Sequence, residues 1–134
     1  EVLGLRVTMD LGANVTLTGG VALQTQESWC EFISKDLQSI SFGGNAAELY
    51  FEEDKFDDFL KKLAAIKGIF YVHPVQQYSW GQRVIRFYDP DFHILEVGEN
   101  MKSVCRRFLD SGMTIEAAAV RMNVPEKFVR ACVR

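Results

Sequence analysis

The alternation of apolar and polar residues is clearest late in the chain, where it predicts a β-hairpin. A strand from Arg83 to Tyr88 meets the turn Asp89-Pro90-Asp91, and a second strand returns from Ile94 to Val97. Because successive side chains of a strand point to opposite faces, Arg86 and Glu96 fall on polar faces and the reverse faces are apolar. A glutamate between apolar residues in mid-strand is locally unfavourable, so Glu96 marks either a solvated face or a functional site.

Shorter stretches of the same kind fill the rest of the first hundred residues. Alternation predicts strands over residues 5–11, 15–18, 21–24, 47–52 and 69–73. Pro74 is expected to stop the last of these strands, because proline has no N–H to donate. Residues 27–36 fit either a short helix or an ordered loop. Apolar residues at helical spacing predict a helix over 56–66, capped by Asp54 and ended by Gly68.

Two similar halves meet at Gly43-Gly44-Asn45, a cluster of turn-forming residues. The second half reads as strand, helix and three strands, and the first half ends in three strands. We therefore predict an α+β fold of paired βαβββ modules forming a curved mixed sheet, with the first strand lying before Glu1. The helices would cover the sheet faces that bear Val7, Leu23, Leu49, Phe51, Ile85, Phe87, Leu95 and Val97. A concave polar surface would then carry Gln24, Glu48, Arg86 and Glu96.

Charge divides the chain differently, at about residue 100. Residues 1–100 hold 8 Lys and Arg against 15 Asp and Glu, a net charge of -7, whereas residues 101–134 hold 7 against 3, a net charge of +4. Helical patterns over 101–110, 114–122 and 125–133 make this second segment a basic helical tail. The first segment, 1–100, is predicted to be the domain that carries the paired modules.

The tail is similar to a helix-turn-helix, with Asn123 at the turn and Ala118 as the small residue that lets two helices approach. Lys127, Arg130 and Arg134 could then face phosphate, which would make the chain a ligand-sensing DNA binder. Alternatively, the apolar residues of the tail dock it on the body or on a partner subunit; these are Phe108, Ile115, Val120, Phe128 and Val129. Because the acidic body would repel a duplex, nucleic acid is not the expected partner.

The overall composition is that of a globular protein, with 48% hydrophobic and 25% charged residues among 134. No apolar run is long enough to cross a membrane and no secretion signal begins the chain, so we expect a cytoplasmic protein without a membrane partner. Its three cysteines form no Cys-x-x-Cys pair and are odd in number, which favours reduced, packed thiols over disulfides or a structural zinc site.

The segment Ala47–Asp54, the following helix, Trp80-Gly81-Gln82-Arg83 and the run Asp89-Pro-Asp-Phe-His-Ile-Leu-Glu96 together resemble the vicinal oxygen chelate superfamily. That superfamily includes glyoxalase-type lyases, extradiol dioxygenases, fosfomycin-resistance enzymes and bleomycin-binding proteins. The resemblance covers residues 1 to about 100. One residue departs from the pattern, since Phe92 stands where this turn usually carries glycine.

The resemblance implies that cavity-facing residues on the first and last strands of each module bind a metal ion. Glu96 and Glu48 match two of these positions, Gln24 lies near a third, and the fourth would precede Glu1. Glu48 and Glu96 would also act in catalysis. Oxygen ligands of this kind suit a divalent metal such as Mg²⁺, Mn²⁺, Fe²⁺, Ni²⁺ or Zn²⁺, which polarises substrate oxygens so that a carboxylate can move a proton.

These implications lead to two main hypotheses. The first is a metal-dependent lyase, isomerase or dioxygenase-like enzyme acting on a small molecule, and the second is a metal-free protein that binds a drug or metabolite. In both, Tyr50, Trp80 and Tyr88 would line an aromatic pocket, or would pack at the seam of a homodimer. Arg86 would balance the carboxylates or orient an anionic substrate by bidentate hydrogen bonds, or it would form a structural salt bridge. His73 and His93 are expected to make local hydrogen bonds rather than to bind metal.

Overall fold

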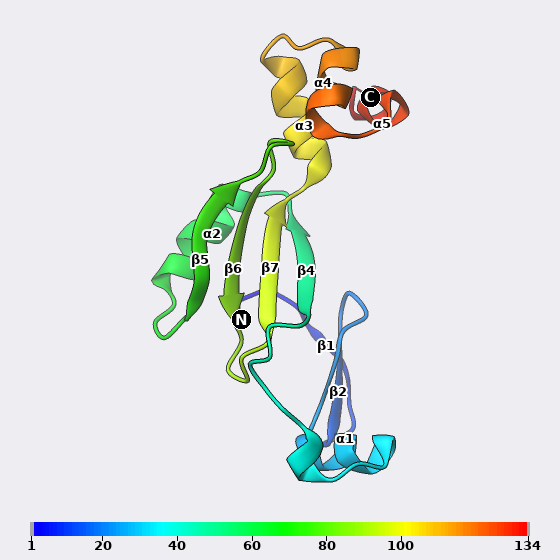
Figure 1. The fold of residues 1–134 in the computed structure, drawn as a ribbon, viewed down its shortest axis with the longest axis vertical. Helices are drawn as coiled ribbons and strands as arrows, with labels where there is room; N and C mark the ends of the chain where they lie inside the picture. Colours follow the sequence, from blue (N-terminus) through cyan, green and yellow to red (C-terminus); the bar gives the residue numbers. More distant parts are fainter. Residues whose placement is uncertain (1, 134) are drawn as a thin grey trace. The chain divides into compact units, whose positions relative to one another are not determined.

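The computed structural model describes residues 2–133, which form two compact units that meet between Gly44 and Asn45. The unit boundary falls within the turn-forming cluster where the sequence predicted the junction of two halves. Each unit contains its own β-sheet, and five α-helices complete an α+β fold (Figure 1). The helical tail belongs to the second unit.

The first unit is an antiparallel three-stranded sheet followed by a helix. Its strands are β1 (Val7–Asp10), β2 (Asn14–Leu17) and β3 (Ala22–Gln24), in the order β1-β2-β3. Helix α1 (Gln26–Ile33) follows, and a short 3-10 helix η1 (Leu37–Ser39) comes after it. The segment that the sequence left open between helix and loop is thus helical. The hydroxyl of Thr25 caps α1 by accepting a hydrogen bond from the backbone N–H of Ser28.

The second unit contains one complete βαβββ module. Its elements are β4 (Glu48–Glu53), α2 (Phe56–Ala65), β5 (Tyr71–Gln77), β6 (Arg83–Tyr88) and β7 (Ile94–Glu99). The strands lie in the order β4-β7-β6-β5, and β4 and β7 are parallel while the other pairs are antiparallel. The predicted mixed sheet is therefore present in this unit, with the hairpin β6–β7 at its centre.

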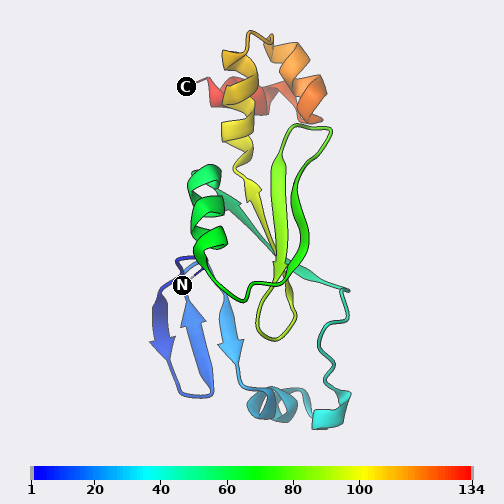
Figure 2. The ribbon, with the colours of Figure 1, turned by 90° about the vertical axis from the view of Figure 1, so that its left-hand side faces the viewer.

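Helix α2 lies against one face of the four-stranded sheet (Figure 2). Phe56, Phe59 and Leu63 on this helix are buried, and the ring of Phe59 lies 6.4 Å from that of Phe87 on β6. Four of the apolar sheet residues that the alternation assigned to a covered face are buried; these are Ile85, Phe87, Leu95 and Val97. Burial of such side chains is the main force that holds helix and sheet together.

Three other predicted core positions are wrong. Val7, Leu23 and Leu49 are exposed. Helix α1 buries only Cys30 of its own residues, so it gives β1 and β3 little cover. Leu49 is exposed because β4 is an edge strand of the sheet, whereas α2 packs on the central strand β6.

Local predictions around α2 and β5 also need correction. Lys55 rather than Asp54 is the N-cap residue, without a side-chain cap, and the helix ends at Ala65, before Gly68. Strand β5 continues through Pro74 to Gln77 instead of stopping there. An edge strand tolerates proline because one of its sides has no partner to receive an N–H, and the pairing with β6 is irregular on either side of His73.

The tail forms three helices directly after β7, as the sequence predicted. They are α3 (Met101–Asp110), α4 (Ile115–Met122) and α5 (Glu126–Cys132), and their core consists of Val104, Cys105, Phe108, Ala118, Ala119, Met122, Val129 and Cys132. Asn123 adopts a left-handed conformation at the turn between α4 and α5, and Ala118 is fully buried. The side chain of Val120 is 82% exposed, so it does not dock the tail on the body, and its docking on a partner subunit stays a prediction.

Candidate functional site

Three strands place their polar side chains on the face of the sheet opposite α2. The pairing register sets Tyr50 of β4 beside Glu96 of β7, and Glu96 beside Arg86 of β6. Glu48 lies two residues before Tyr50 and therefore shares this face. We call this surface the polar sheet face, defined by Glu48, Tyr50, Arg86 and Glu96.

Arg86 holds the two glutamates of the polar sheet face together. Its Nε donates to Glu48 Oε2 over 2.7 Å, and its Nη2 lies 3.5 Å from Glu48 Oε1. The same Nη2 forms an ion pair with Glu96 Oε2. Glu96 is only 6% exposed, so its charge needs such a partner in the protein. The sequence thus correctly placed both carboxylates and Arg86 on one face.

Two further residues contact Arg86, and neither was among the predicted site residues. Nη1 of Arg86 donates to the hydroxyl of Tyr78 over 2.6 Å and lies 3.2 Å from Nε2 of His73. Nδ1 of His73 lies 2.7 Å from the carbonyl oxygen of Pro74, so His73 makes the local hydrogen bonds expected of it. His73 already lies in the strand predicted over 69–73, so the missing information was the pairing of that strand with β6, which sets His73 opposite Arg86.

The two carboxyl groups have pKa values shifted in opposite directions. Hydrogen bonding to Arg86 lowers the pKa of Glu48, whereas burial raises the pKa of Glu96. Each glutamate also acts on the other, since the nearby charge of Glu48 contributes to the rise at Glu96. The two carboxyl groups on either side of one guanidinium therefore ionise over different pH ranges.

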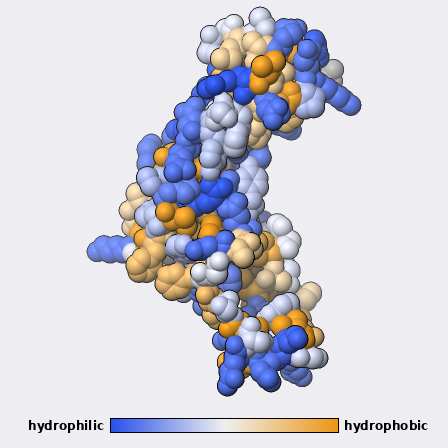
Figure 3. All heavy atoms as spheres, viewed as in Figure 1, coloured by the Kyte–Doolittle hydropathy of each residue, from blue (hydrophilic) through white to orange (hydrophobic). Residues whose placement is uncertain are grey.

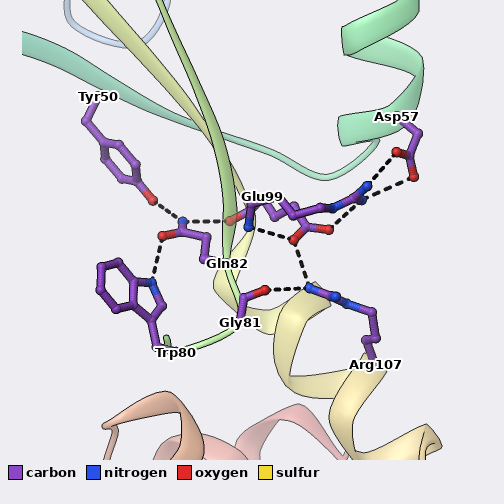
Figure 4. Close-up of polar contacts among 8 residues, drawn as sticks. Tyr50, Asp57, Trp80, Gly81, Gln82, Glu99 and Arg107 are labelled. Atoms are coloured by element: carbon purple, nitrogen blue, oxygen red, sulfur yellow. Dashed lines mark hydrogen bonds and ion pairs between the residues drawn. The ribbon is translucent and has the colours of Figure 1, made fainter. Parts of the chain in front are cut away.

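A hydrogen-bonded amide connects two of the predicted aromatic residues (Figure 4). The side chain of Gln82 donates to the hydroxyl of Tyr50 over 2.9 Å and accepts from Nε1 of Trp80 over 3.0 Å. Trp80 in turn stacks on Tyr78, with ring centroids 4.5 Å apart. Burial raises the pKa of the Tyr50 hydroxyl. Two of the predicted aromatic residues thus belong to one connected group, and its connecting residue, Gln82, was not predicted.

Tyr88 stands apart from this group. Its hydroxyl donates to Asn45 Oδ1 over 2.9 Å, and its ring lies 5.7 Å from that of Phe92. Phe92 has a φ of 64°, in the left-handed region where the turn pattern of the superfamily has glycine. Phe92 therefore adopts a backbone conformation that favours glycine.

Glu99 forms a second cluster, which connects the sheet to α2 and to the tail (Figure 4). Its carboxylate accepts from Arg83 over 2.7 Å and from Arg107 of α3 over 2.8 Å. Arg83 also binds Asp57 of α2 over 2.8 Å, and Arg107 donates to the carbonyl of Gly81. A cavity of about 380 Å³ beside these residues lies on the α2 side of the sheet. This cluster connects the tail to the four-stranded sheet and to α2.

The arrangement of Glu48 and Glu96 around Arg86 does not fit a divalent metal ion. The guanidinium of Arg86 contacts both Glu48 and Glu96 and would repel a second cation. Within residues 2–133, no group of three or more His, Cys, Asp or Glu side chains is arranged to hold a metal. Gln24, the third predicted ligand, lies at the end of β3 in the first unit, so its place beside the glutamates stays a prediction.

Comparison with known proteins agrees with the fold. The family model described as a glyoxalase-like domain matches residues 1–102. The chain therefore belongs to the glyoxalase-like domain family, within the vicinal oxygen chelate superfamily. A search of curated proteins found no match.

Three solved structures illustrate the likeness. A protein of unknown function from Agrobacterium tumefaciens str. C58 is 37% identical, with a TM-score of 0.63 over 73% of this chain and 76% of the other. A glyoxalase/bleomycin resistance protein/dioxygenase superfamily member from Sphaerobacter thermophilus is 25% identical, with a TM-score of 0.52 over 74% and 80%. A lactoylglutathione lyase from Agrobacterium tumefaciens is 22% identical, with a TM-score of 0.56 over 75% and 79%. The last of these supports the fold alone.

None of the helices within residues 2–133 combines the length and the apolar character that a membrane crossing requires.

Proposed function

We propose that this chain is a metal-free small-molecule-binding protein of the glyoxalase-like family, which takes its ligand on the polar sheet face. The observation that carries the proposal is the position of Arg86, whose Nε and Nη2 reach Glu48 and whose Nη2 also pairs with Glu96. Two adjacent carboxylates require a cation, a shared proton or water. Here the guanidinium supplies the positive charge that a metal ion would otherwise supply.

The residues around this centre support binding of an organic molecule. Tyr50 remains 47% exposed, although Gln82 fixes its hydroxyl. An aromatic side chain with one polar end anchored and its ring open to solvent presents apolar surface at little entropic cost. The ligand would therefore lie over Tyr50, with Glu48 at its side.

Nuclear magnetic resonance (NMR) titration tests this proposal. The probes are soluble aromatic fragments bearing an amine, a hydroxyl or a carboxylate, added to ¹⁵N-labelled protein. At least one fragment is expected to shift the amide signals of residues 48–52 and 96, and Tyr50→Ala is expected to abolish these shifts. Tyr71→Ala is the matched control, because Tyr71 is also an exposed tyrosine on a strand of this sheet. Shifts confined to other parts of the chain would reject the proposal.

The second candidate function is a metal-dependent lyase, isomerase or dioxygenase that uses Glu48 and Glu96, with Gln24 as a further ligand. The opposite pKa shifts of the two carboxyl groups favour it, since they separate the pH ranges over which the two groups ionise. Such a pair suits general acid and base catalysis. This function requires Arg86 to leave both glutamates, which is why we rank it second. Metal content separates the two candidates.

A homodimer in the cytoplasm remains our expectation for the working form. Large apolar side chains are exposed on both units, and the space-filling view shows apolar residues among polar ones on the surface (Figure 3). They include Val7, Met9, Leu23, Phe70 and Tyr71. Exposed apolar groups of this number support association with another surface. Light scattering at several protein concentrations would measure the mass in solution, and a monomer at every concentration would reject the dimer.

DNA binding by the tail remains a third hypothesis, and the contacts of the tail support it least. Arg130 pairs with Glu126 over 3.0 Å and lies 3.9 Å from Glu116, so this predicted phosphate ligand has acidic partners already. Lys127 is exposed, and Arg134 lies outside the described residues. Fluorescence polarisation with mixed duplexes at low salt decides the matter. Binding that Arg130→Ala weakens would support the hypothesis, and no binding would remove it.

A further inference from the structure

The guanidinium of Arg86, on the polar sheet face, uses its N–H groups in contacts within the protein. Arginine carries five N–H groups, and Arg86 has five contacts that match them: two with Glu48, and one each with Glu96, Tyr78 and His73. The guanidinium is also largely buried, with its side chain 20% exposed. An anionic ligand would therefore find no vacant donor on Arg86.

The exposed charged side chains on the Tyr50 face of β4 are acidic. The side chain of Glu48 is 38% exposed, and Glu52 at the other end of β4 is exposed as well. Hydrogen bonding to Arg86 lowers the pKa of Glu48, which keeps this carboxylate ionised at neutral pH. An incoming carboxylate or phosphate would be repelled, whereas a cation would be attracted.

Tyr50 lies between the two glutamates on the same face of β4. Residues two apart in a strand are separated by roughly 7 Å, so Glu48 and Glu52 flank the tyrosine ring. The ring rests against Gly98, where an added Cβ would lie 3.3 Å from Tyr50 Cε2. Its hydroxyl accepts from Gln82 and donates to Glu52 over 3.1 Å. The ring is thus fixed at its back and at its hydroxyl, and its remaining surface faces solvent.

We propose that the polar sheet face selects an organic cation, such as a primary or quaternary ammonium group, which sits on the Tyr50 ring between Glu48 and Glu52. The inference rests on the proposed function and specifies the chemical class of the ligand. A cation within about 6 Å of an aromatic centroid is attracted to the face of the ring, and two flanking carboxylates add to that attraction. The glycine at position 98 serves this site by leaving room for the ring.

Three probes of similar size test the inference: benzyltrimethylammonium, benzyl alcohol and benzoate. Each is titrated into the full chain and followed by NMR at low salt. Benzyltrimethylammonium is expected to bind at least about threefold more tightly than benzyl alcohol, and more tightly still than benzoate. Its affinity should fall as salt is added, whereas that of benzyl alcohol should not. The shifted signals should come from residues 48–52 and 98.

Variants assign the preference to particular side chains. Glu52→Gln should weaken benzyltrimethylammonium binding severalfold and leave benzyl alcohol unchanged. Glu31→Gln, at an exposed glutamate of α1 in the first unit, removes the same charge and should change neither affinity. Tyr50→Leu should abolish the preference for the cation, while Tyr50→Phe, which keeps the ring, should retain most of it.

The outcomes separate this inference from the proposed function. Tighter binding of the cation, sensitive to Glu52→Gln but not to Glu31→Gln, supports the inference. If benzoate or benzyl alcohol shifts the same residues with equal or greater affinity, the site binds small molecules but the cation inference is overturned. If none of the three probes shifts signals on the polar sheet face, the inference is overturned; if the wider fragment set also fails there, the proposed function falls with it.

Discussion

Arg86 on β6 reaches across β7 to Glu48 on β4, and its Nε lies 2.7 Å from Glu48 Oε2. Glu96, on the strand between them, pairs with the same guanidinium. One side chain therefore links three neighbouring strands. Because the arginine is central to this arrangement, its removal leaves two glutamates with no positive partner beside them.

Arg86→Met is expected to lower the free energy of unfolding at pH 7 by about 2 kcal/mol. This is less than the roughly 3–5 kcal/mol typical of a fully buried pair, since Glu48 is partly exposed and solvent screens it. Urea denaturation measures the change. Adding Glu48→Gln and Glu96→Gln to Arg86→Met should restore most of the loss, because the uncompensated charges are then gone. A loss that persists in the triple variant would show that packing, and not charge, explains the effect.

The two glutamates should give opposite dependences of stability on pH. Glu96, with its raised pKa, contributes stability that is fully present below about pH 4.5 and is lost as pH rises through its folded pKa. Glu48, with its lowered pKa, contributes stability that is present above about pH 4.5 and is lost as pH falls through its folded pKa.

Single substitutions expose these two contributions. Relative to the unchanged chain, Glu96→Gln should become progressively more stable as pH rises above about 4.5, because glutamine stays neutral. Relative to the unchanged chain, Glu48→Gln should become progressively less stable as pH rises from the folded pKa of Glu48 towards about 4.5, and the difference should level off above that pH. Urea denaturation between pH 3 and 8 measures both differences. Parallel curves for the two variants would contradict the opposite pKa shifts.

Much of the site could be predicted from alternation alone, because in a regular strand the period of two assigns each side chain to a face. This rule placed Arg86 and Glu96 correctly and gave β6 its observed bounds. The rule failed where the backbone is irregular. Proline at position 74 indicated a strand end, yet β5 continues to Gln77. Because its register with β6 is irregular, alternation did not pair His73 with Arg86, and Tyr78, which follows the strand, was missed as well.

Contacts between residues far apart in the sequence could not be predicted either. Nothing in the local pattern indicates that Gln82 joins Tyr50 to Trp80. The hydrogen bond between Gln82 and Tyr50 joins residues that lie 32 positions apart in the sequence. Likewise, Leu49 has the alternation of a core residue, but its exposure depends on its place at the sheet edge. The tail was predicted well, since caps and turns such as Thr114 and Asn123 are local signals.

Phe92 provides a test of backbone strain in the hairpin turn. Phe92→Gly should be more stable than Phe92→Ala by about 1 kcal/mol, because glycine adopts a φ of 64° without the steric conflict of a Cβ. Both variants lose the ring contacts with Tyr88 and Phe70, so the comparison isolates the backbone. Chemical denaturation gives the two values. An alanine variant as stable as the glycine variant would argue against strain at this position.

Gly81 tests how the tail docks. A Cβ at this position would lie 2.2 Å from Cζ of Phe108 on α3, and φ is 89°. Gly81→Ala should therefore destabilise the protein by about 2 kcal/mol or more, as α3 is displaced. Gly112→Ala is the matched control, since its φ is 91° but its surroundings are open; it should cost only about 1 kcal/mol. Equal losses in thermal or urea unfolding would mean that Phe108 does not constrain position 81.

Metal content tests most directly the claim that Arg86 takes the place of a metal ion. The full chain and its Glu96→Gln variant are dialysed against Zn²⁺, Ni²⁺, Mn²⁺, Fe²⁺ or Mg²⁺ and then against buffer. The bound metal is measured by elemental analysis. We predict no stoichiometric metal in the unchanged chain, and none in Glu96→Gln. A stoichiometric metal that the unchanged chain retains and Glu96→Gln loses would contradict the account and would favour the metal-dependent enzyme.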